Sequence, residues 1–445
     1  MVTKSFRILL AIWNLDPDLV MEHWDIKQAF INAPLDEIIY CRPVPGFEKW
    51  EGEILKLRKA LYGTKQAAHA WQKFLKSKLL LLGARVHPKD DCVFIFRDEN
   101  GGWLFLSTHV DDLFPLFNKR GAYLRDKVMS ALRKEVEVDE RGLLNWALST
   151  KIQRDPVRGL LKISQEENIV SIIRDHGFEL IEGADTPAVE QGLDMQMLES
   201  DLPVSDEEKA RAGDFPFKQI IGKLWWLALI SRPDIVFALH RCACWQNRPS
   251  EKLKRWVIRI IRYLKNTKTL GLVFDRKNFN DNQILVGFSD ASFMGEEKSK
   301  SRFGNLFYVG GCLVHWTSSK TSRIVTSSTE AEIHGLIHIG KENIWQREFH
   351  EILDYFKISG PTLVYQDNTA AISLSSGGVC HKRSKHFGLE FDAFREYVQR
   401  GEIRIVHLQT DALVADLLTK PLGPSKFIKF RDEIMGGEGV QMHFD

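Results

Sequence analysis

Hydrophobic and polar residues are distributed so that strands and helices are predicted along the whole chain. The run 104–117, LFLSTHVDDLFPLF, is apolar and β-prone except for two adjacent carboxylates, Asp111 and Asp112. Because bare charges on a buried strand are costly, the pattern predicts a tight strand–turn–strand with both acids at its tip. Two alternatives remain: the acids bind a divalent cation that offsets their repulsion, or they are solvated in an ordinary turn.

Helical periodicity is clearest in the middle of the chain. We expect helices over 5–13 and after a Tyr-Gly turn in 56–74, and two helices in 215–245 separated before Pro233. A helix starting at Pro249-Ser250 and running to about residue 268 has one apolar face. Basic residues recur on another face of this helix: Lys252, Arg255, Arg259 and Arg262. They are either solvated or contact phosphates, and the near absence of acids favours phosphate contacts.

The composition changes after residue 284, where four acids follow predicted elements in a fixed order. They are Asp290 at the end of a strand, Glu332 on a helix over 326–345, Asp367 after a strand, and Asp416 on a helix over 411–420. Ser327 and Glu330 form the capping signature of the first of these helices. Each acid alone is most simply a cap or surface residue. Together they have the order that a ribonuclease H fold requires.

Composition and charge limit how the protein can work. A length of 445 residues with 44% hydrophobic and 27% charged residues is sufficient for two or three domains. The 61 basic and 59 acidic residues leave a net charge of +2, so polyanion binding must come from local basic faces. Six cysteines without a C-x2-C pair predict reduced thiols. With no apparent signal peptide or membrane span, we expect an intracellular protein, cytoplasmic or nuclear.

Several motifs together resemble one family. WDIKQAF, LDEIIYCRPVPGF, LRKALYGTKQAAHAW, HVDD and SRPDI are similar to the reverse transcriptase of copia-type LTR retrotransposon polyproteins. The words SDA, SSTEAE, QDN, SKH and ADLLTKPL are similar to the ribonuclease H domain of the same family. Two positions depart from the family pattern: His109 replaces an aromatic residue, and Pro115 lies where aliphatic residues are usual and where proline is awkward in a central strand.

The resemblance implies roles for particular residues. In the polymerase, Asp25, Asp111 and Asp112 would hold two Mg²⁺ ions, Phe30 would be the steric gate that excludes a 2′-hydroxyl, and Tyr62-Gly63 would lie near the incoming dNTP. In the nuclease, Asp290, Glu332, Asp367 and Asp416 would bind metal, with Glu332 favoured over Glu330. The remaining residues expected near nucleic acid are Lys65, Lys385 and His386.

The resemblance also implies a domain organisation. The fold class is a multidomain α+β and α/β architecture. We expect a reverse transcriptase palm with partial fingers over 1–185, a thumb- or connection-like helical region over 186–280, a ribonuclease H-like mixed sheet flanked by helices over 281–425, and a tail over 426–445. Because the sequence starts within a predicted helix, the fingers are expected to be largely missing.

The predicted function is an RNA-directed DNA polymerase with ribonuclease H activity. Its cofactors would be Mg²⁺ or Mn²⁺, two per active site, and its partners an RNA template, a DNA primer, their hybrid and dNTPs. Two alternatives are kept. In the first, the chain is a decayed retroelement copy that binds nucleic acid but does not polymerise. In the second, it is a working nuclease whose palm serves only as a scaffold.

Overall fold

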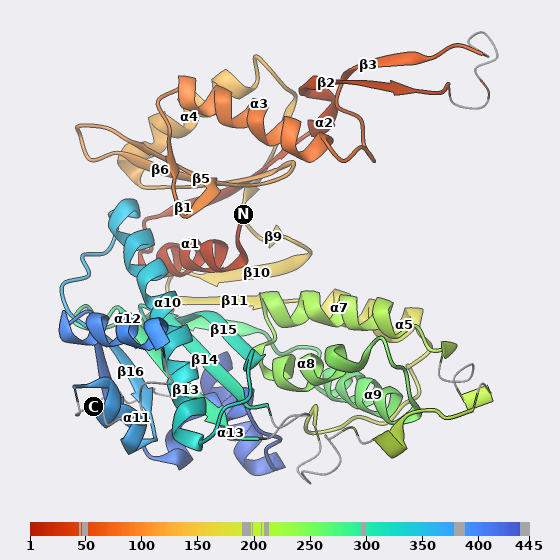
Figure 1. Cartoon of the computed structure of the whole chain (residues 1–445). Helices are drawn as coiled ribbons and strands as arrows, with labels where there is room; N and C mark the ends of the chain where they lie inside the picture. The colour runs from red at the N-terminus through yellow and green to blue at the C-terminus, as the bar shows by residue number, and fades with distance from the viewer. Residues whose placement is uncertain are drawn as a thin grey trace. The chain divides into compact units, whose positions relative to one another are not determined.

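The computed structural model describes residues 1–43, 46, 52–188, 197, 199–205, 207–208, 213–294, 300–377 and 388–436. It divides into two compact units, one formed by Met1–Leu9 and Asp16–Ala147 and the other by Leu10–Leu15 and Leu148–Asp445 (Figure 1). The predicted site residues Lys385 and His386, and residues 437–445 of the predicted tail, lie outside the described residues. The mixed α and β multidomain architecture predicted from the sequence is confirmed. None of the helices in the described ranges is both long and apolar enough to cross a lipid bilayer.

The first unit is built on a six-stranded sheet in the order β4-β5-β6-β7-β1-β8. Its strands are β1 (Val20–Ile26), β4 (Arg85–His87), β5 (Asp90–Arg97), β6 (Trp103–His109), β7 (Asp112–Phe117) and β8 (Val138–Leu143), and the short β9 (Trp146–Ala147) ends the unit. The helices are α2 (Ala29–Asn32), α3 (Ala67–Leu81) and α4 (Ala122–Leu132), preceded by α1 (Thr3–Leu15). Trp71, Leu75 and Leu79 recur at helical spacing on α3 and are buried in a core shared with Trp24 and Leu106 of the sheet.

The predicted strand–turn–strand is the hairpin of β6 and β7, in which His109 pairs with Asp112. Pro115 lies within β7, between β6 and β1. The ladder from β7 to β6 is continuous, whereas the ladder to β1 omits Phe114 and Pro115. The central strand therefore accommodates a residue without a backbone N–H by interrupting pairing on one side only.

A two-stranded ribbon of β2 (Pro34–Cys41) and β3 (Leu55–Lys59) leaves the same unit and pairs with no other strand (Figure 1). Its register places Tyr40 opposite Lys56. Ile38 and Tyr40 are 65% and 61% exposed. Sequence analysis did not single out these residues, because a motif match does not show that a segment projects from the sheet.

The second unit contains a sheet of β10 (Thr150–Asp155), β11 (Leu160–Ser164) and β12 (Leu272–Asp275), paired antiparallel. Between β11 and β12 come α5 (Glu166–Asp175), η3 (Glu199–Asp201), α7 (Phe217–Ile230), η4 (Pro233–Ile235), α8 (Val236–Trp245) and α9 (Glu251–Asn266). The break before Pro233 is as predicted. The start of α9 is also confirmed, because the Ser250 hydroxyl accepts a hydrogen bond from the Leu253 amide at 3.2 Å.

A five-stranded sheet in the order β15-β14-β13-β16-β17 follows. Its strands are β13 (Leu285–Ser292), β14 (Arg302–Val309), β15 (Cys312–Lys320), β16 (Thr362–Gln366) and β17 (Ile403–His407). The helices are α10 (Ser328–Leu353), α11 (Thr369–Ser375), α12 (Gly388–Gln399) and α13 (Pro424–Met435). β13 is antiparallel to β14 and parallel to β16. A Cβ at Gly287 of β13 would lie 2.5 Å from Ile339 of α10, so this glycine permits the close packing of helix on sheet.

The predicted helix over 411–420 is wrong in type. The segment forms two 3₁₀ turns, η8 (Thr410–Ala412) and η9 (Val414–Leu418). Leu413 between them has φ −79° and ψ 91°, an extended conformation that interrupts helical hydrogen bonding. Its side chain is fully buried, so burial of this residue prevails over the local helical preference.

Candidate active sites

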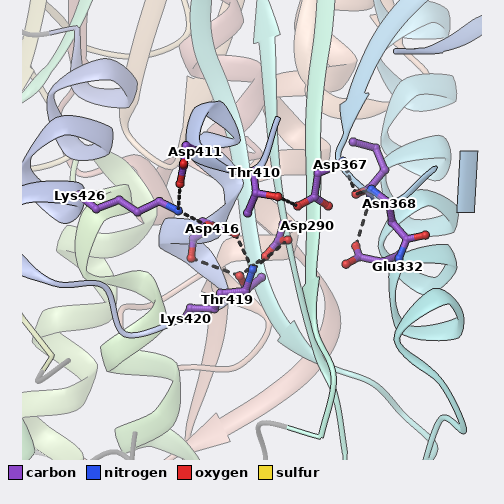
Figure 2. A network of polar contacts seen from close by, with 11 residues as sticks. Asp290, Glu332, Asp367, Asn368, Thr410, Asp411, Asp416, Thr419, Lys420 and Lys426 are labelled. Atoms are coloured by element: carbon purple, nitrogen blue, oxygen red, sulfur yellow. Dashed lines mark hydrogen bonds and ion pairs between the residues drawn. The ribbon is translucent and has the colours of Figure 1, made fainter. Parts of the chain in front are cut away.

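Three carboxylates from three elements converge in the second unit (Figure 2). Asp290 comes from β13, Glu332 from α10, and Asp367 from the residue that follows β16. Their oxygen atoms lie within 4.8 Å of one another. Asp290 and Glu332 are buried, with residue exposures of 1% and 6%. The parallel pairing of β13 and β16 brings two of these acids to the same end of the sheet.

Neighbouring polar groups fix the orientation of this cluster. Gln366 Nε2 donates to Glu332 Oε2 at 3.1 Å, and Gln366 Oε1 accepts from the Asp367 amide at 2.7 Å. The Thr410 hydroxyl donates to Asp367 Oδ2 at 2.8 Å. Gln366 therefore connects Glu332 and Asp367 through one side chain, and Thr410 of η8 holds the carboxylate of Asp367.

Glu332, and not Glu330, belongs to the cluster, as the sequence had predicted. Glu330 instead completes the helix cap: its amide donates to the Ser327 hydroxyl at 3.1 Å, and its Oε2 accepts from the Thr326 amide at 2.6 Å. The two acids lie two positions apart and so point to different faces of the helix.

Asp416 is close to the cluster but is engaged differently. Its Oδ1 is 2.6 Å from Lys420 Nζ and its Oδ2 is 2.9 Å from Lys426 Nζ. Lys420 also approaches Asp290 Oδ1 at 3.4 Å, and the Thr419 hydroxyl donates to Asp290 Oδ2. In Figure 2, Asp416 and its lysines lie on one side of Asp290 and Glu332 on the other. Of the four predicted acids, three thus cluster, and the fourth is ion-paired.

The cluster carries more negative charge than its surroundings stabilise. Burial raises the pKa of Asp290, and the neighbouring Asp416 raises it further. Burial also raises the pKa of Glu332, with added contributions from Asp290 and Asp367. For Lys420, burial opposes the charged form, but the charges of Asp290 and Asp416 outweigh it and raise the pKa of the ammonium. Buried, close-set carboxylate oxygens are the donor set that a hard divalent cation prefers, so these residues fit Mg²⁺ or Mn²⁺.

The second set of predicted acids lies in the first unit. Asp25 of β1 pairs across strands with Asp112 of β7, and Asp111 occupies the hairpin turn beside them. The Ile26 amide donates to the Asp111 carbonyl at 2.9 Å. Val110 has φ +57°, a conformation that is unfavourable for a β-branched residue, and Trp71 Nε1 donates to its carbonyl at 2.5 Å. The turn is thus held in a strained form by the helix α3.

Two of these acids, Asp112 and Asp25, are paired with basic side chains of the same unit. His23 Nε2 lies 2.6 Å from Asp112 Oδ1, and Arg141 Nη2 lies 3.4 Å from Asp25 Oδ2. Burial raises the pKa of Asp111, and Asp112 and Asp25 add to the effect. Within the described ranges, one group of three acids has ligand oxygens that all lie within 4.8 Å of one another, and it consists of Asp290, Glu332 and Asp367. The first-unit set is therefore more open and partly neutralised.

Two of the residues expected near a nucleotide have aromatic rings that lie close together. The rings of Phe30 and Tyr62 are 4.7 Å apart between centroids. Tyr62 is 52% exposed, while Phe30 packs partly against the core. Gly63 has φ +90° and an open space where a Cβ would lie. Lys65 is exposed. Phe30 and Tyr62 thus lie together, while the steric gate at Phe30 and the dNTP contact at Tyr62-Gly63 stay predictions.

The basic face of α9 is largely occupied by contacts within the chain. Lys252 Nζ lies 2.9 Å from Asp201 Oδ2, and Arg259 Nη2 donates to the Thr186 hydroxyl at 3.0 Å. Arg262 Nε donates to the Glu182 carbonyl at 2.8 Å. Arg255 is exposed. Three of the four basic residues therefore hold the segment before η3 and η3 itself, which explains their spacing without phosphate; for Arg255 a phosphate contact stays a prediction.

Sequence reasoning missed several residues around the carboxylate cluster. They are Gln366, Thr410, Thr419, Lys420 and Lys426. One signal was available: Asp416 and Lys420 stand four apart, a spacing that brings opposite charges together on a helical turn. The role of Gln366 had no such signal, because it depends on which strand lies beside α10.

Comparison with known proteins finds similarity to reverse transcriptases and to Pol polyproteins of transposons. The reverse transcriptase (RNA-dependent DNA polymerase) family matches residues 2–190. The Pol polyprotein from transposon TNT 1-94 of Nicotiana tabacum is 29% identical over 430 residues, covering 95% of this chain and 31% of the relative. The chain is thus similar over nearly its whole length to a retrovirus-related Pol polyprotein of a transposon. The RE1 Pol polyprotein of Arabidopsis thaliana is also 29% identical, covering 97% of this chain and 28% of its own length. The chain thus spans about a third of the length of the curated relatives it matches.

Solved structures show weaker likeness. LC11-RNase H1 in complex with an RNA/DNA hybrid aligns with a TM-score of 0.25 and 15% identity, over 30% of this chain and 93% of that one. The foamy viral protease-reverse transcriptase in complex with double-stranded DNA aligns with a TM-score of 0.22 and 13% identity, over 88% and 59%. At such scores the alignments support no conclusion about function.

Proposed function

We propose that this protein is an RNA-directed DNA polymerase that also degrades the RNA strand of RNA/DNA hybrids. The observation that carries the nuclease half is the buried cluster of Asp290, Glu332 and Asp367. Three carboxylates supplied by a central strand, a helix and a neighbouring parallel strand create a strongly anionic site in an otherwise packed fold. Such an arrangement destabilises the protein unless it binds a cation, so it is best explained by function.

The residues of the cluster define what a bound cation would do. A divalent ion held there would activate a water molecule and stabilise the leaving oxygen during phosphodiester hydrolysis. Gln366 and Thr410 keep Glu332 and Asp367 in orientation, so that the oxygen ligands are arranged before the substrate binds. Discrimination for RNA would rest on contacts to 2′-hydroxyl groups of the hybrid.

The polymerase half is supported by the family match over residues 2–190. Asp25, Asp111 and Asp112 would hold the ions for transfer of a dNTP to a DNA primer on an RNA template. The contact between Phe30 and Tyr62 fits a platform beside the nucleotide sugar, where an aromatic ring would exclude a 2′-hydroxyl.

One experiment tests both halves. An RNA template annealed to a DNA primer, each with its own label, is incubated with the protein, dNTPs and Mg²⁺ or Mn²⁺. We expect Asp290→Asn to abolish RNA cleavage and leave primer extension, and Asp112→Asn to do the reverse. Cleavage that persists in Asp290→Asn would refute the proposed nuclease site.

A second candidate is a nuclease carried on a palm that does not polymerise. It is favoured by the partners of the first-unit acids, since His23 engages Asp112 and Arg141 engages Asp25. The same assay separates the two, because this candidate predicts RNA cleavage without any primer extension by the wild-type protein.

A further inference from the structure

Lys420 occupies a position in the nuclease site where a cation would be expected. Its ammonium lies 2.6 Å from Asp416 Oδ1 and 3.4 Å from Asp290 Oδ1, so it bridges two of the four acids. Lys426 contacts the other oxygen of Asp416 at 2.9 Å. Asp416, which is 1% exposed, therefore has an ammonium group on each of its oxygens. Within the described residues, the group that could hold a metal ion consists of Asp290, Glu332 and Asp367 and does not include Asp416.

The position of Lys420 is fixed by the backbone around it. The Lys420 amide donates to the Asp416 carbonyl at 3.0 Å, which closes a turn directly after η9. Gly304 of β14 pairs with Asp290, and a Cβ there would lie 2.6 Å from Leu418 and 2.9 Å from Thr419. The glycine thus lets the end of η9 approach the sheet beside Asp290. The Lys420 side chain is 35% exposed, so its stem is packed rather than free in solvent.

The charges of the site can be balanced by a single divalent cation. Apart from the exposed Asp411, which also contacts Lys426 at 3.6 Å, four carboxylates face two ammonium groups, so two negative charges remain when all of these groups are ionised. One divalent cation at Asp290, Glu332 and Asp367 neutralises them. A second divalent cation between Asp290 and Asp416 would lie where Lys420 Nζ is and would be repelled by it.

We propose that Lys420 takes the place of a second divalent cation in the free protein, which consequently binds one metal ion at the Asp290, Glu332 and Asp367 cluster. The inference rests on the proposed nuclease function and changes its metal count, because the sequence had led us to expect two ions per site. Lys420 is then a positioning residue that holds Asp416 and Asp290 in place of an ion.

The test counts bound ions in the full chain without substrate. Asp25→Asn, Asp111→Asn and Asp112→Asn are introduced first, to remove binding in the other unit. Mn²⁺ bound is then measured by calorimetric titration and by electron paramagnetic resonance of the free ion. We expect one ion in this background and two after Lys420→Met, because the substitution removes the competing charge. Lys426→Met is the matched control: it removes the same charge from Asp416 but leaves Lys420 in place, so one ion is expected.

The outcomes separate this inference from the proposed function. Two ions in the background protein would overturn the role of Lys420 and leave the nuclease assignment intact. No ion, or binding that survives Asp290→Asn, would overturn the nuclease assignment itself. One ion both before and after Lys420→Met would also refute the inference. If Lys420→Met does not fold, judged by its thermal melt, Lys420→Gln is used in its place, and the count in the background protein still decides.

Discussion

At the scale of single residues, two glutamates near the start of α10 have different tasks. Glu332 is buried with Asp290 and Asp367, whereas Glu330 caps the helix. Glu332→Gln should lower hybrid cleavage by about 100-fold or more, since a ligand of the metal is lost. Glu330→Gln should cleave at nearly the wild-type rate, because glutamine can still accept the capping hydrogen bond. Cleavage rates of both variants at saturating Mg²⁺ are the measurement, and equal losses would contradict the assignment.

The raised pKa of Glu332 also predicts how stability depends on pH. In metal-free protein the folded state keeps a proton on Glu332 at pH values where the unfolded chain has lost it, that is, above the ordinary value near 4.5. The folded state then binds more protons, so stability falls as pH rises through this window. Thermal melts in EDTA should show that the melting temperature falls more steeply with rising pH for the wild type than for Glu332→Gln. Equal slopes for the two proteins would show that this carboxyl is not the cause.

These residue assignments were only partly available from the sequence. The family resemblance favoured Glu332 over Glu330, and the structure places Glu332 in the carboxylate cluster and Glu330 at the helix cap, while the catalytic role stays a prediction. The state of Asp416 was not predictable: its lysines come from the end of η9 and from α13, and their approach depends on Gly304 in another strand. Spacing indicates which residues share a face, but not which distant group neutralises them.

At the scale of elements, the basic residues of α9 could serve either as a binding surface or as structural contacts, and two substitutions distinguish these roles. Lys265 Nζ donates to the carbonyls of Glu179 and Ile181 at 2.6 and 2.7 Å. Lys265→Met should therefore lower the free energy of unfolding by about 1–3 kcal/mol. Lys268→Met, which removes only a surface ion pair with Glu166 at 3.9 Å, should change it by less than about 1 kcal/mol. Urea denaturation of both variants is the measurement, and similar small effects would reject the structural reading of this face.

The elements themselves were predicted well where local signals are strong. The hairpin of β6 and β7 follows from an apolar, β-prone run interrupted by two acids, and the start of α9 follows from a serine cap. The segment 411–420 failed because its apolar residues suit a helix, yet Leu413 is extended to reach the core. The intrachain partner of Arg262 was missed for a related reason: a backbone carbonyl 80 residues away carries no side-chain signal.

At the scale of the whole molecule, the division into two units does not follow the order of the chain. Residues Leu10–Leu15 of α1 belong to the second unit, although the next residues of that unit begin at Leu148. Asn14 is fully buried, and its Nδ2 donates to the carbonyls of Gly159 and Phe274 at 3.0 and 3.1 Å. Arg154 also donates to the Trp13 carbonyl at 2.6 Å. The second unit is therefore completed by a segment from the start of the chain.

This arrangement predicts that a substitution near the N-terminus weakens the nuclease half. Asn14→Ala removes two buried hydrogen bonds, although the Gly159 carbonyl keeps the bond from the Arg276 amide at 2.8 Å. The loss should cost about 0.5–1.5 kcal/mol for each bond. RNA cleavage should then be lost at a lower temperature than in the wild type, while primer extension should be lost at the same temperature as in the wild type. Asn32→Ala is the matched control, because Asn32 donates to two carbonyls, those of Lys27 and Gln28, at an exposed site of the first unit. If both activities of Asn14→Ala fail at one temperature, the two units unfold together and the division has no consequence for stability.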